Sequence, residues 1–209
     1  MSDLRIVNVT ADLADRCAAL ESLCFPLADP DYLVKAADVR TYARKFPQGF
    51  FVMLDGDRVV AQAAGLLVNF DFDHPQHTVL DICGADGSLP AHRDDGEWYY
   101  GTDIAVLPEF RGRGLGKQLY DLRKDLVRRL GLRGIVAGSH IEGFAHHKHA
   151  MTAEEYVERV VRGELRDPTL SFQLANGFRA LGVLRGYIIE PEIDSCAALI
   201  VWDNVVSTP

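Results

Sequence analysis

The chain has 209 residues and a formal net charge of −8 at pH 7; 48% of its residues are hydrophobic and 25% are charged, as in an ordinary globular protein with a sizeable core. The negative charge argues against a general nucleic-acid partner, because phosphate backbones repel an acidic surface. No apolar run reaches the roughly 18 residues of a membrane span, the N-terminus lacks the apolar segment of a signal peptide, and the four scattered cysteines fit a reducing compartment, so we expect a cytoplasmic protein without membrane contact.

The first part of the chain predicts a strand, two helices and a β-hairpin. Residues 4–9 alternate as a strand does, and residues 10–24 and 31–46 have helical patterns that prolines interrupt. Residues 50–70 contain two apolar runs joined at Asp55-Gly56-Asp57. Asp-Gly between apolar runs is a strong hairpin signal.

Residues 71–96 form a polar stretch that is long for a connection between strands. Loops of this length are usually either functional or flexible. Two interpretations therefore stay open: a loop beside the substrate site, and a surface excursion without a chemical role.

The second part predicts strands that alternate with helices. A strand at 97–107 leads through a glycine-rich segment into a helix at 115–130, and a short buried strand follows at 134–140. Thr152 and Glu155 form a capping box that starts the next helix. A short helix from 168 to 178 ends near Gly177, and two final strands complete a single α/β domain of residues 1–209.

Five leucines of the 115–130 helix fall on one stripe, which we expect to pack on the sheet: Leu115, Leu119, Leu122, Leu126 and Leu130. Arg123 and the other basic residues fall elsewhere on the helical wheel.

The glycine-rich segment, PEFRGRGLGKQLY from Pro108 to Tyr120, fits a phosphate-binding turn. It is not a P-loop, because Gly116-Lys117 is followed by Gln118 instead of serine or threonine. It is not a dinucleotide fingerprint, because its glycines are spaced differently and several strands precede it. It matches the pattern Arg/Gln-x-x-Gly-x-Gly/Ala in full, with Arg111, Gly114 and Gly116.

The physical reason for this pattern lies at the start of the helix. The first N–H groups of a helix have no partner within it, and glycines let a pyrophosphate approach them without a side-chain collision. Arg111, Arg113 and Lys117 add positive charge. An ordinary strand–turn–helix corner is the alternative, which three glycines at alternate positions disfavour.

The segment IAVLPEFRGRGLGKQLY resembles the acetyl-CoA-binding segment of the GNAT superfamily of N-acetyltransferases. The resemblance covers most of the chain, and LSFQLANGF matches the late family helix that ends in Gly-Phe. It implies an α/β (α+β) fold in which helices flank a mixed, mostly antiparallel sheet of about seven strands. It also implies an N-acetyltransferase that uses acetyl-CoA to modify an amine of a small molecule or protein, and it leaves a homodimer open.

A narrower resemblance concerns the C-terminal part of the chain. MTAEEYVERVVRGELRDPTLSFQLANGF is similar to the acetyltransferase-like domain that some bacterial proteins carry ahead of a nitrilase-type hydrolase domain. Because the chain stops at Pro209, we expect that second domain to be absent. The substrate is not specified by this likeness.

The resemblance also implies the cofactor-binding residues. The strand before the glycine turn splays from its neighbour in the family, so that its free backbone groups bind the pantetheine arm and polarise the thioester. The predicted cofactor-binding residues are Ile104, Ala105, Val106, Arg111, Gly112, Arg113, Gly114, Leu115, Gly116, Lys117 and Phe172.

For the catalytic base, Asp103 is the best-placed carboxylate, one residue before the pantetheine-binding run. A carboxylate in an apolar strand tends to have a raised pKa. Glu97 and Glu142 are less central candidates. The alternative interpretation is that Asp103 faces solvent or forms a structural ion pair with an arginine.

The catalytic acid is where the sequence departs from the family. Many members carry a tyrosine four residues before the Gly-Phe, and Gln173, preceded by Phe172, stands there instead. Glutamine is no proton donor near neutral pH. His140 is the first candidate for the acid, with Ser171, Tyr99, Tyr100 or water as substitutes. The departure also leaves open a catalytically weak protein that binds acyl-CoA.

Four histidines cluster within ten residues, and we predict no metal site from them: His140, His146, His147 and His149. A metal site would call for accompanying carboxylates or cysteines in a ligand pattern, which the segment lacks. A loop over the acceptor pocket is the preferred interpretation.

Overall fold

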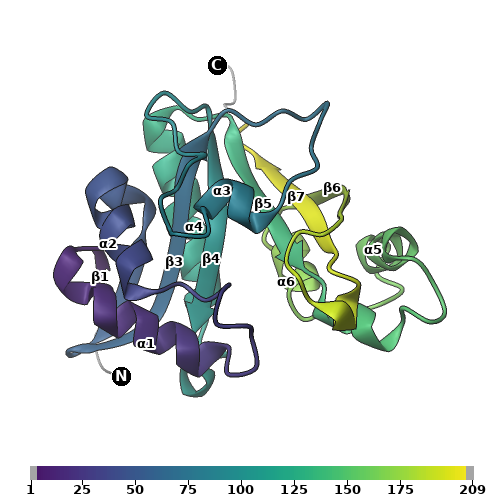
Figure 1. Cartoon of the computed structure of the whole chain (residues 1–209), viewed down its shortest axis with the longest axis horizontal. Helices are drawn as coiled ribbons and strands as arrows, with labels where there is room; N and C mark the ends of the chain where they lie inside the picture. The colour runs from purple at the N-terminus through teal and green to yellow at the C-terminus, as the bar shows by residue number, and fades with distance from the viewer. Residues whose placement is uncertain (1–3, 206–209) are drawn as a thin grey trace.

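In a computed structural model, which describes residues 4–205, the chain forms one seven-stranded sheet with helices on both faces (Figure 1). The strand order is β1-β2-β3-β4-β5-β7-β6, and each neighbouring pair is antiparallel except β4 and β5. The predicted mixed, mostly antiparallel sheet is therefore confirmed. The strands are β1 (Arg5–Asn8), β2 (Phe51–Asp55), β3 (Arg58–Val68), β4 (Trp98–Val106), β5 (Gly134–His140), β6 (Arg179–Leu184) and β7 (Ala197–Asp203).

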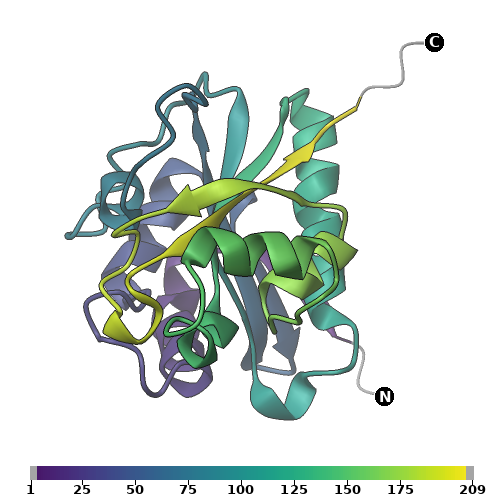
Figure 2. The ribbon, with the colours of Figure 1, turned by 90° about the vertical axis from the view of Figure 1, so that its right-hand side faces the viewer.

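Helices α1 and α2 cover one face of the sheet and α4 covers the other, as the two views show (Figures 1 and 2). Within residues 4–205, no helix has both the length and the hydrophobicity needed to cross a membrane. The α-helices are α1 (Ala14–Cys24), α2 (Ala36–Lys45), α3 (Val79–Cys83), α4 (Leu115–Leu130), α5 (Ala153–Val161) and α6 (Leu170–Ala175).

Local signals placed most of these elements correctly. The hairpin turns at Gly56, whose φ is +60°, and the capping box of α5 has both of its hydrogen bonds, between Thr152 and Glu155. The helix predicted from residue 31 begins at Ala36 instead. The Asp38 carboxylate accepts a hydrogen bond from the Lys35 N–H at 2.8 Å, which fixes the helix start there.

The 71–96 stretch contains one short helix, α3, which the sequence did not predict. Thr78 caps it: the Thr78 hydroxyl accepts from the Asp81 N–H at 3.1 Å, and the Asp81 carboxylate accepts from the Thr78 N–H at 2.7 Å. The stretch is therefore partly ordered by its own local hydrogen bonds.

The central feature of the sheet is the divergence of β4 from β5. Their parallel pairing ends at Tyr100 and Val136, although both strands continue beyond it. The cause is a bulge in β4: Ala64 pairs with Asp103 and Gly65 with Gly101, so Thr102 is an extra residue. A bulge increases local twist and bends the strand, and here it turns β4 away from β5.

Arg123 contacts this bulge from the face of the sheet that α4 covers. Its buried guanidinium donates to the backbone carbonyls of Ala64 and Asp103 and lies over the rings of Tyr99 and Tyr120. A side chain at Gly101 would come within 3.2 Å of the guanidinium, so the glycine leaves room for it. Arg123 lies off the leucine stripe and is nevertheless buried, because the bulge supplies carbonyl partners for its charge.

The leucine stripe is correspondingly only partly buried. Leu115, Leu119 and Leu126 lie in the core, whereas Leu122 is half-buried and Leu130 is 39% exposed. Tyr120, Arg123 and Val127 complete the buried face in place of the other two leucines. The core-facing side of α4 is therefore rotated relative to the predicted stripe.

We expect Leu119→Ala to lower the free energy of unfolding by about 2–5 kcal/mol, because Leu119 is 0% exposed and its removal leaves a cavity. Leu130→Ala, the same change on the same helix, should stay within about 0.5 kcal/mol. Urea unfolding of both variants measures the difference. Equal losses would contradict the orientation of α4.

Candidate active site

The glycine-rich turn joins β4 to α4 and exposes a run of unpaired amides. Gly112 and Gly114 have φ of +75° and +83°, a left-handed backbone that favours glycine, and Gly114 caps α4. The first helical hydrogen bond runs from the Gln118 N–H to the Gly114 carbonyl at 3.1 Å. In the part of the chain that is described, the N–H groups of residues 112–117 have no acceptor. Such a turn is suited to binding an anion.

The three cations of this turn are held at its rim. Arg111 Nε donates to the Val106 carbonyl at 3.1 Å, and Arg113 donates to the Glu109 carbonyl at 2.8 Å. Lys117 pairs with Asp121 at 2.7 Å. All three are exposed and keep further N–H donors for a ligand.

Phe172 of α6 lies beside the turn. A side chain at Gly116 would come within 3.0 Å of its ring, and the ring itself is exposed. Leu115 is buried, so only its backbone can contact a ligand. The structure thus brings Phe172 to the predicted cofactor loop, although it is distant in the sequence.

Ile104, Ala105 and Val106 lie on β4 beyond its divergence from β5. They pair with β3 on one edge, and within residues 4–205 their other edge has no ladder partner. Apart from the Val106 carbonyl, which accepts from Arg111, backbone groups without a ladder partner therefore line one side of the split between β4 and β5, directly before the glycine-rich turn. This is the arrangement that the predicted pantetheine contacts require.

Asp103 lies at the start of the same segment. It is half-buried, and its Oδ2 accepts a hydrogen bond from the Gln62 amide at 2.9 Å. Burial raises the pKa of Asp103 to about 6, against the opposing effects of the Gln62 hydrogen bond and the Arg123 charge. Glu97 pairs with Arg133 at the other end of β4, and Glu142 lies beyond β5, so Asp103 is the carboxylate on the diverging segment.

His140 ends β5, and its Nε2 lies 2.7 Å from Glu190 Oε2. His140 shares a face of β5 with Gly138, because side chains alternate along a strand. On that face Tyr187 packs against Gly138, and its hydroxyl hydrogen-bonds the hydroxyl of Tyr100 of β4. The extra residue in the bulge brings Asp103 to that same face. Asp103 and His140 therefore face the same side of the sheet across the split.

The other candidate acids are occupied elsewhere. Tyr99 is buried and donates to the Gly49 carbonyl, while Tyr100 is buried between His77 and Tyr187. Burial raises the pKa of both phenols. The Ser171 hydroxyl accepts from the Asp167 N–H at 3.0 Å.

Gln173 points into the core. It is buried and donates to the Tyr120 hydroxyl at 3.0 Å, and its own carbonyl oxygen has no partner among the described residues. Its hydrogen-bonding capacity is therefore directed at α4 and away from solvent.

Three residues of the site were not singled out in the sequence: Glu21, Gln62 and Glu190. Glu21 lies on the buried face of α1, between Cys17 and Cys24 at helical spacing. Gln62 stands in the otherwise apolar run of β3 and is 0% exposed. A polar residue at an apolar position of a helix or strand is the signal that could have found both.

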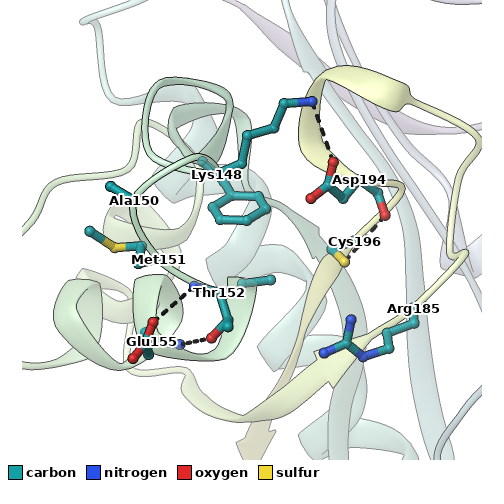
Figure 3. A pocket seen from close by; sticks show the side chains of 10 residues that line it. Lys148, Ala150, Met151, Thr152, Glu155, Arg185, Asp194 and Cys196 are labelled. Atoms are coloured by element: carbon teal, nitrogen blue, oxygen red, sulfur yellow. Dashed lines mark hydrogen bonds and ion pairs between the residues drawn. The ribbon is translucent and has the colours of Figure 1, made fainter.

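A cavity of about 470 Å³ lies away from the glycine-rich turn, next to α5 and the β6–β7 connection (Figure 3). Its cations already have partners: Lys148 lies 3.3 Å from Asp194, and Arg185 lies 2.5 Å from Glu154. None of the predicted site residues lines it. Within residues 4–205, no cluster of three metal-ligating side chains is present either.

A model of the acetyltransferase (GNAT) family matches residues 14–151. Two curated relatives come from Bacillus subtilis (strain 168). The probable hydrolase YhcX is 35% identical over 205 residues, which are 98% of this chain and 39% of that protein, so the chain spans about two fifths of its length. The uncharacterized N-acetyltransferase YkwB is 31% identical over 203 residues, which are 97% of this chain and 89% of that protein.

Two solved structures have the same fold at low sequence identity. The loading GNATL domain of CurA from Lyngbya majuscula has a TM-score of 0.84 at 20% identity, covering 96% of this chain and 98% of that one. The GphF GNAT-like decarboxylase, in complex with isobutyryl-CoA, has a TM-score of 0.75 at 22% identity, covering 95% and 98%.

Proposed function

The chain belongs to the acetyltransferase (GNAT) family, and we propose that it is an acetyl-CoA-dependent N-acyltransferase that acts in the cytoplasm. It transfers the acetyl group to a primary amine of a small molecule or of a protein. Residues 1–209 form a single acetyltransferase domain in this proposal. The name of the relative YkwB and the isobutyryl-CoA bound to GphF agree with an acyl-CoA donor.

The observation that carries the proposal is the run of unpaired amides at residues 112–117, placed at the end of a strand that has separated from its neighbour. The amides and the rim cations suit the pyrophosphate of the cofactor. The free edge of β4 suits the pantetheine arm, and its N–H groups can stabilise the thioester oxygen as it gains charge.

Two side chains are assigned to proton transfer. Asp103 takes a proton from the amine, and His140 gives one to the departing thiolate. Glu190 orients the His140 ring through the 2.7 Å contact at Nε2. Both residues face the same side of the sheet, on the two strands that border the split, and the acceptor is proposed to bind between them.

A second candidate is an acyl-CoA-binding module without turnover. The observation in its favour is Gln173, which replaces the family's tyrosine and is directed at Tyr120 instead of solvent. Phe172, the exposed neighbour, carries no proton to donate.

The two candidates separate in one pair of measurements. Calorimetry with acetyl-CoA tests binding, and thiol release with a panel of primary amines tests transfer. Saturable binding with amine-dependent thiol release supports the enzyme, binding without release from any amine supports the module, and absence of binding overturns both. Gas release from an acyl-CoA with a free carboxylate, without any amine, would indicate a decarboxylase such as the one that GphF is named for.

We expect His140→Ala to lower turnover by about 10²-fold, the low end of general acid catalysis. The effect is moderate because a thiol has a pKa of about 8.5 and can leave as the thiolate. Acetyl-CoA affinity should stay unchanged. His74→Ala, at an exposed histidine of the 71–96 stretch, is the control. Full activity of His140→Ala would refute the assignment, and Gln173→Tyr should not restore activity because residue 173 faces the core.

A further inference from the structure

Two carboxyl groups from different elements meet on one buried amide. Gln62 Nε2 of β3 lies 3.2 Å from Glu21 Oε2 of α1 and 2.9 Å from Asp103 Oδ2 of β4. Glu21 is 4% exposed and Gln62 is 0% exposed, while Asp103 is half-buried. The open side of this trio is therefore at Asp103, which faces the split.

The surroundings can balance one negative charge, not two. Arg123 is the buried cation at this position, and it makes no ion pair among the described residues: it donates to the Ala64 and Asp103 carbonyls. Arg111 is exposed and bonded to Val106. Burying two like charges around one cation is costly, and a carboxyl avoids that cost by keeping its proton.

Among residues 4–205, no other group near the trio supplies a second positive charge. The other titratable side chains that interact electrostatically with Glu21 or Asp103 are Cys17, Cys24, Tyr42, Cys83 and Tyr99, and Arg16 interacts with Cys17. Burial raises the pKa of Cys17 to about 12 and of Cys24 to about 11, so both thiols stay neutral. Arg16 lies at the protein surface, 3.5 Å from Asp12. Glu21 itself has a pKa well above its usual range, because of its burial and the adjacent Asp103 charge.

The Gln62 side chain is an independent observation that bears on the protonation of the two carboxyl groups. Its carbonyl oxygen is fully buried and has no hydrogen-bond partner among the described residues. The Gln62 side chain carries an NH2 donor and a carbonyl oxygen acceptor that occupy similar positions. Rotation of the amide therefore replaces the donor with the acceptor, which can accept a hydrogen bond from a protonated carboxyl. The amide can therefore serve the pair in either protonation state.

We propose that Glu21 and Asp103 form a carboxyl pair, joined by Gln62, that holds one proton near neutral pH, with Glu21 neutral and Asp103 ionised. Glu21 is in this view a positioning residue: it anchors Gln62, which in turn orients the Asp103 carboxylate toward the acceptor. The inference rests on the proposed acyl transfer for its catalytic meaning, whereas the shared proton is a property of the folded chain itself.

In the proposed step, the acceptor enters as an ammonium ion and gives one proton to the Asp103 carboxylate. The neutral nitrogen then forms a bond to the thioester carbonyl carbon, and the C–S bond breaks with its electron pair on sulfur. His140 relays the second proton: it gives a proton to the thiolate and takes one from the nitrogen, which yields amide and free thiol. Asp103 finally returns its proton to solvent, while Glu21 keeps its own throughout.

The first test needs neither cofactor nor acceptor. A carboxyl with a raised folded-state pKa binds its proton more tightly in the folded state, so stability is fully present below its unfolded value, 4.5 for glutamate, and is lost as pH rises toward the folded pKa. Between pH 6 and 8, the unfolding constant of the wild type should therefore rise with pH more steeply than that of Glu21→Gln, by at most about tenfold per pH unit.

Other titrating groups are common to both proteins and cancel in this comparison. Glu158→Gln, at an exposed glutamate of α5, controls for loss of a carboxylate as such. Parallel stability curves for the wild type and Glu21→Gln would overturn the shared proton. If Glu21→Gln does not fold, infrared spectroscopy of the wild type at pH 7 decides: a protonated carboxylic acid band supports the pair, and its absence overturns it.

The second test addresses the positioning role in the active enzyme. Glu21→Gln mimics a neutral carboxyl and should keep turnover within about threefold, whereas Glu21→Leu should lower it by about tenfold or more, because Gln62 loses its anchor. Gln62→Leu removes a hydrogen bond that lowers the Asp103 pKa and should move the acidic limb of the pH–rate profile upward by about one unit.

The kinetic outcomes discriminate cleanly. Equal losses in Glu21→Gln and Glu21→Leu, or an unmoved acidic limb in Gln62→Leu, would overturn the positioning role. If no amine is acylated, the proposed function fails, but the stability and infrared results still decide whether the carboxyl pair holds its proton.

Discussion

Asp103→Asn is expected to lower the turnover of amine acylation by about 10²–10⁴-fold, the range for loss of a general base. Asparagine keeps the shape of the side chain and can still accept from the Gln62 amide, so the fold and the acetyl-CoA affinity should be retained. Steady-state kinetics beside calorimetry separates the loss of chemistry from a loss of binding.

The assignment of Asp103 as the base also predicts the direction in which the rate changes with pH. The base acts only when ionised, and burial raises the pKa of Asp103 to about 6. The rate for the wild type should therefore fall as pH drops below about 6, and this acidic limb should vanish in Asp103→Asn.

Glu97→Gln is the matched control, since it makes the corresponding acid-to-amide change just before β4, where Glu97 pairs with Arg133. Its turnover should stay within about twofold of the wild type. If Asp103→Asn behaves like Glu97→Gln, Asp103 is not the base.

Gly114→Val is expected to abolish acetyl-CoA binding. The side chain would occupy the space in front of the amides of residues 112–117, where the pyrophosphate is proposed to lie. It would also strain the backbone, because φ at Gly114 is +83° and a β-branched residue avoids that region.

Gly131→Val separates these two effects. Gly131 follows the other end of α4 with φ of +66°, and an added Cβ there meets nothing within 4 Å, as at Gly114. Both variants should lose about 1–2 kcal/mol or more of unfolding free energy, yet only Gly114→Val should lose the ligand. Calorimetry measures the acetyl-CoA affinity of both variants. Equal affinity would show that the glycine-rich turn is not part of the binding site.

Local sequence patterns were sufficient to predict the features whose causes are local. The Asp55-Gly56-Asp57 hairpin, the α5 capping box and the glycine-rich turn each depend on residues a few positions apart, so their side chains and φ angles already specify the backbone. The order of strands and helices, together with the family resemblance, also predicted the seven-stranded sheet that the structure contains.

Which polar groups are buried depends on how the helices and strands pack together. Periodicity marks the apolar side of α4, but the burial of Arg123 and the exposure of Leu130 depend on the bulge in β4 and on how far the sheet extends beneath the helix. Gln173 turns inward because Tyr120 lies there to accept its hydrogen bond.

The carboxyl pair depends on tertiary structure most of all. Glu21, Gln62 and Asp103 are separated in steps of 41 residues, and their hydrogen bonds exist only because α1, β3 and β4 pack together. Each residue taken alone is an ordinary polar side chain in an amphipathic or apolar segment. The raised proton affinity of the two carboxyl groups comes from their burial side by side, and which residues lie side by side depends on how the elements pack, which no local sequence pattern encodes.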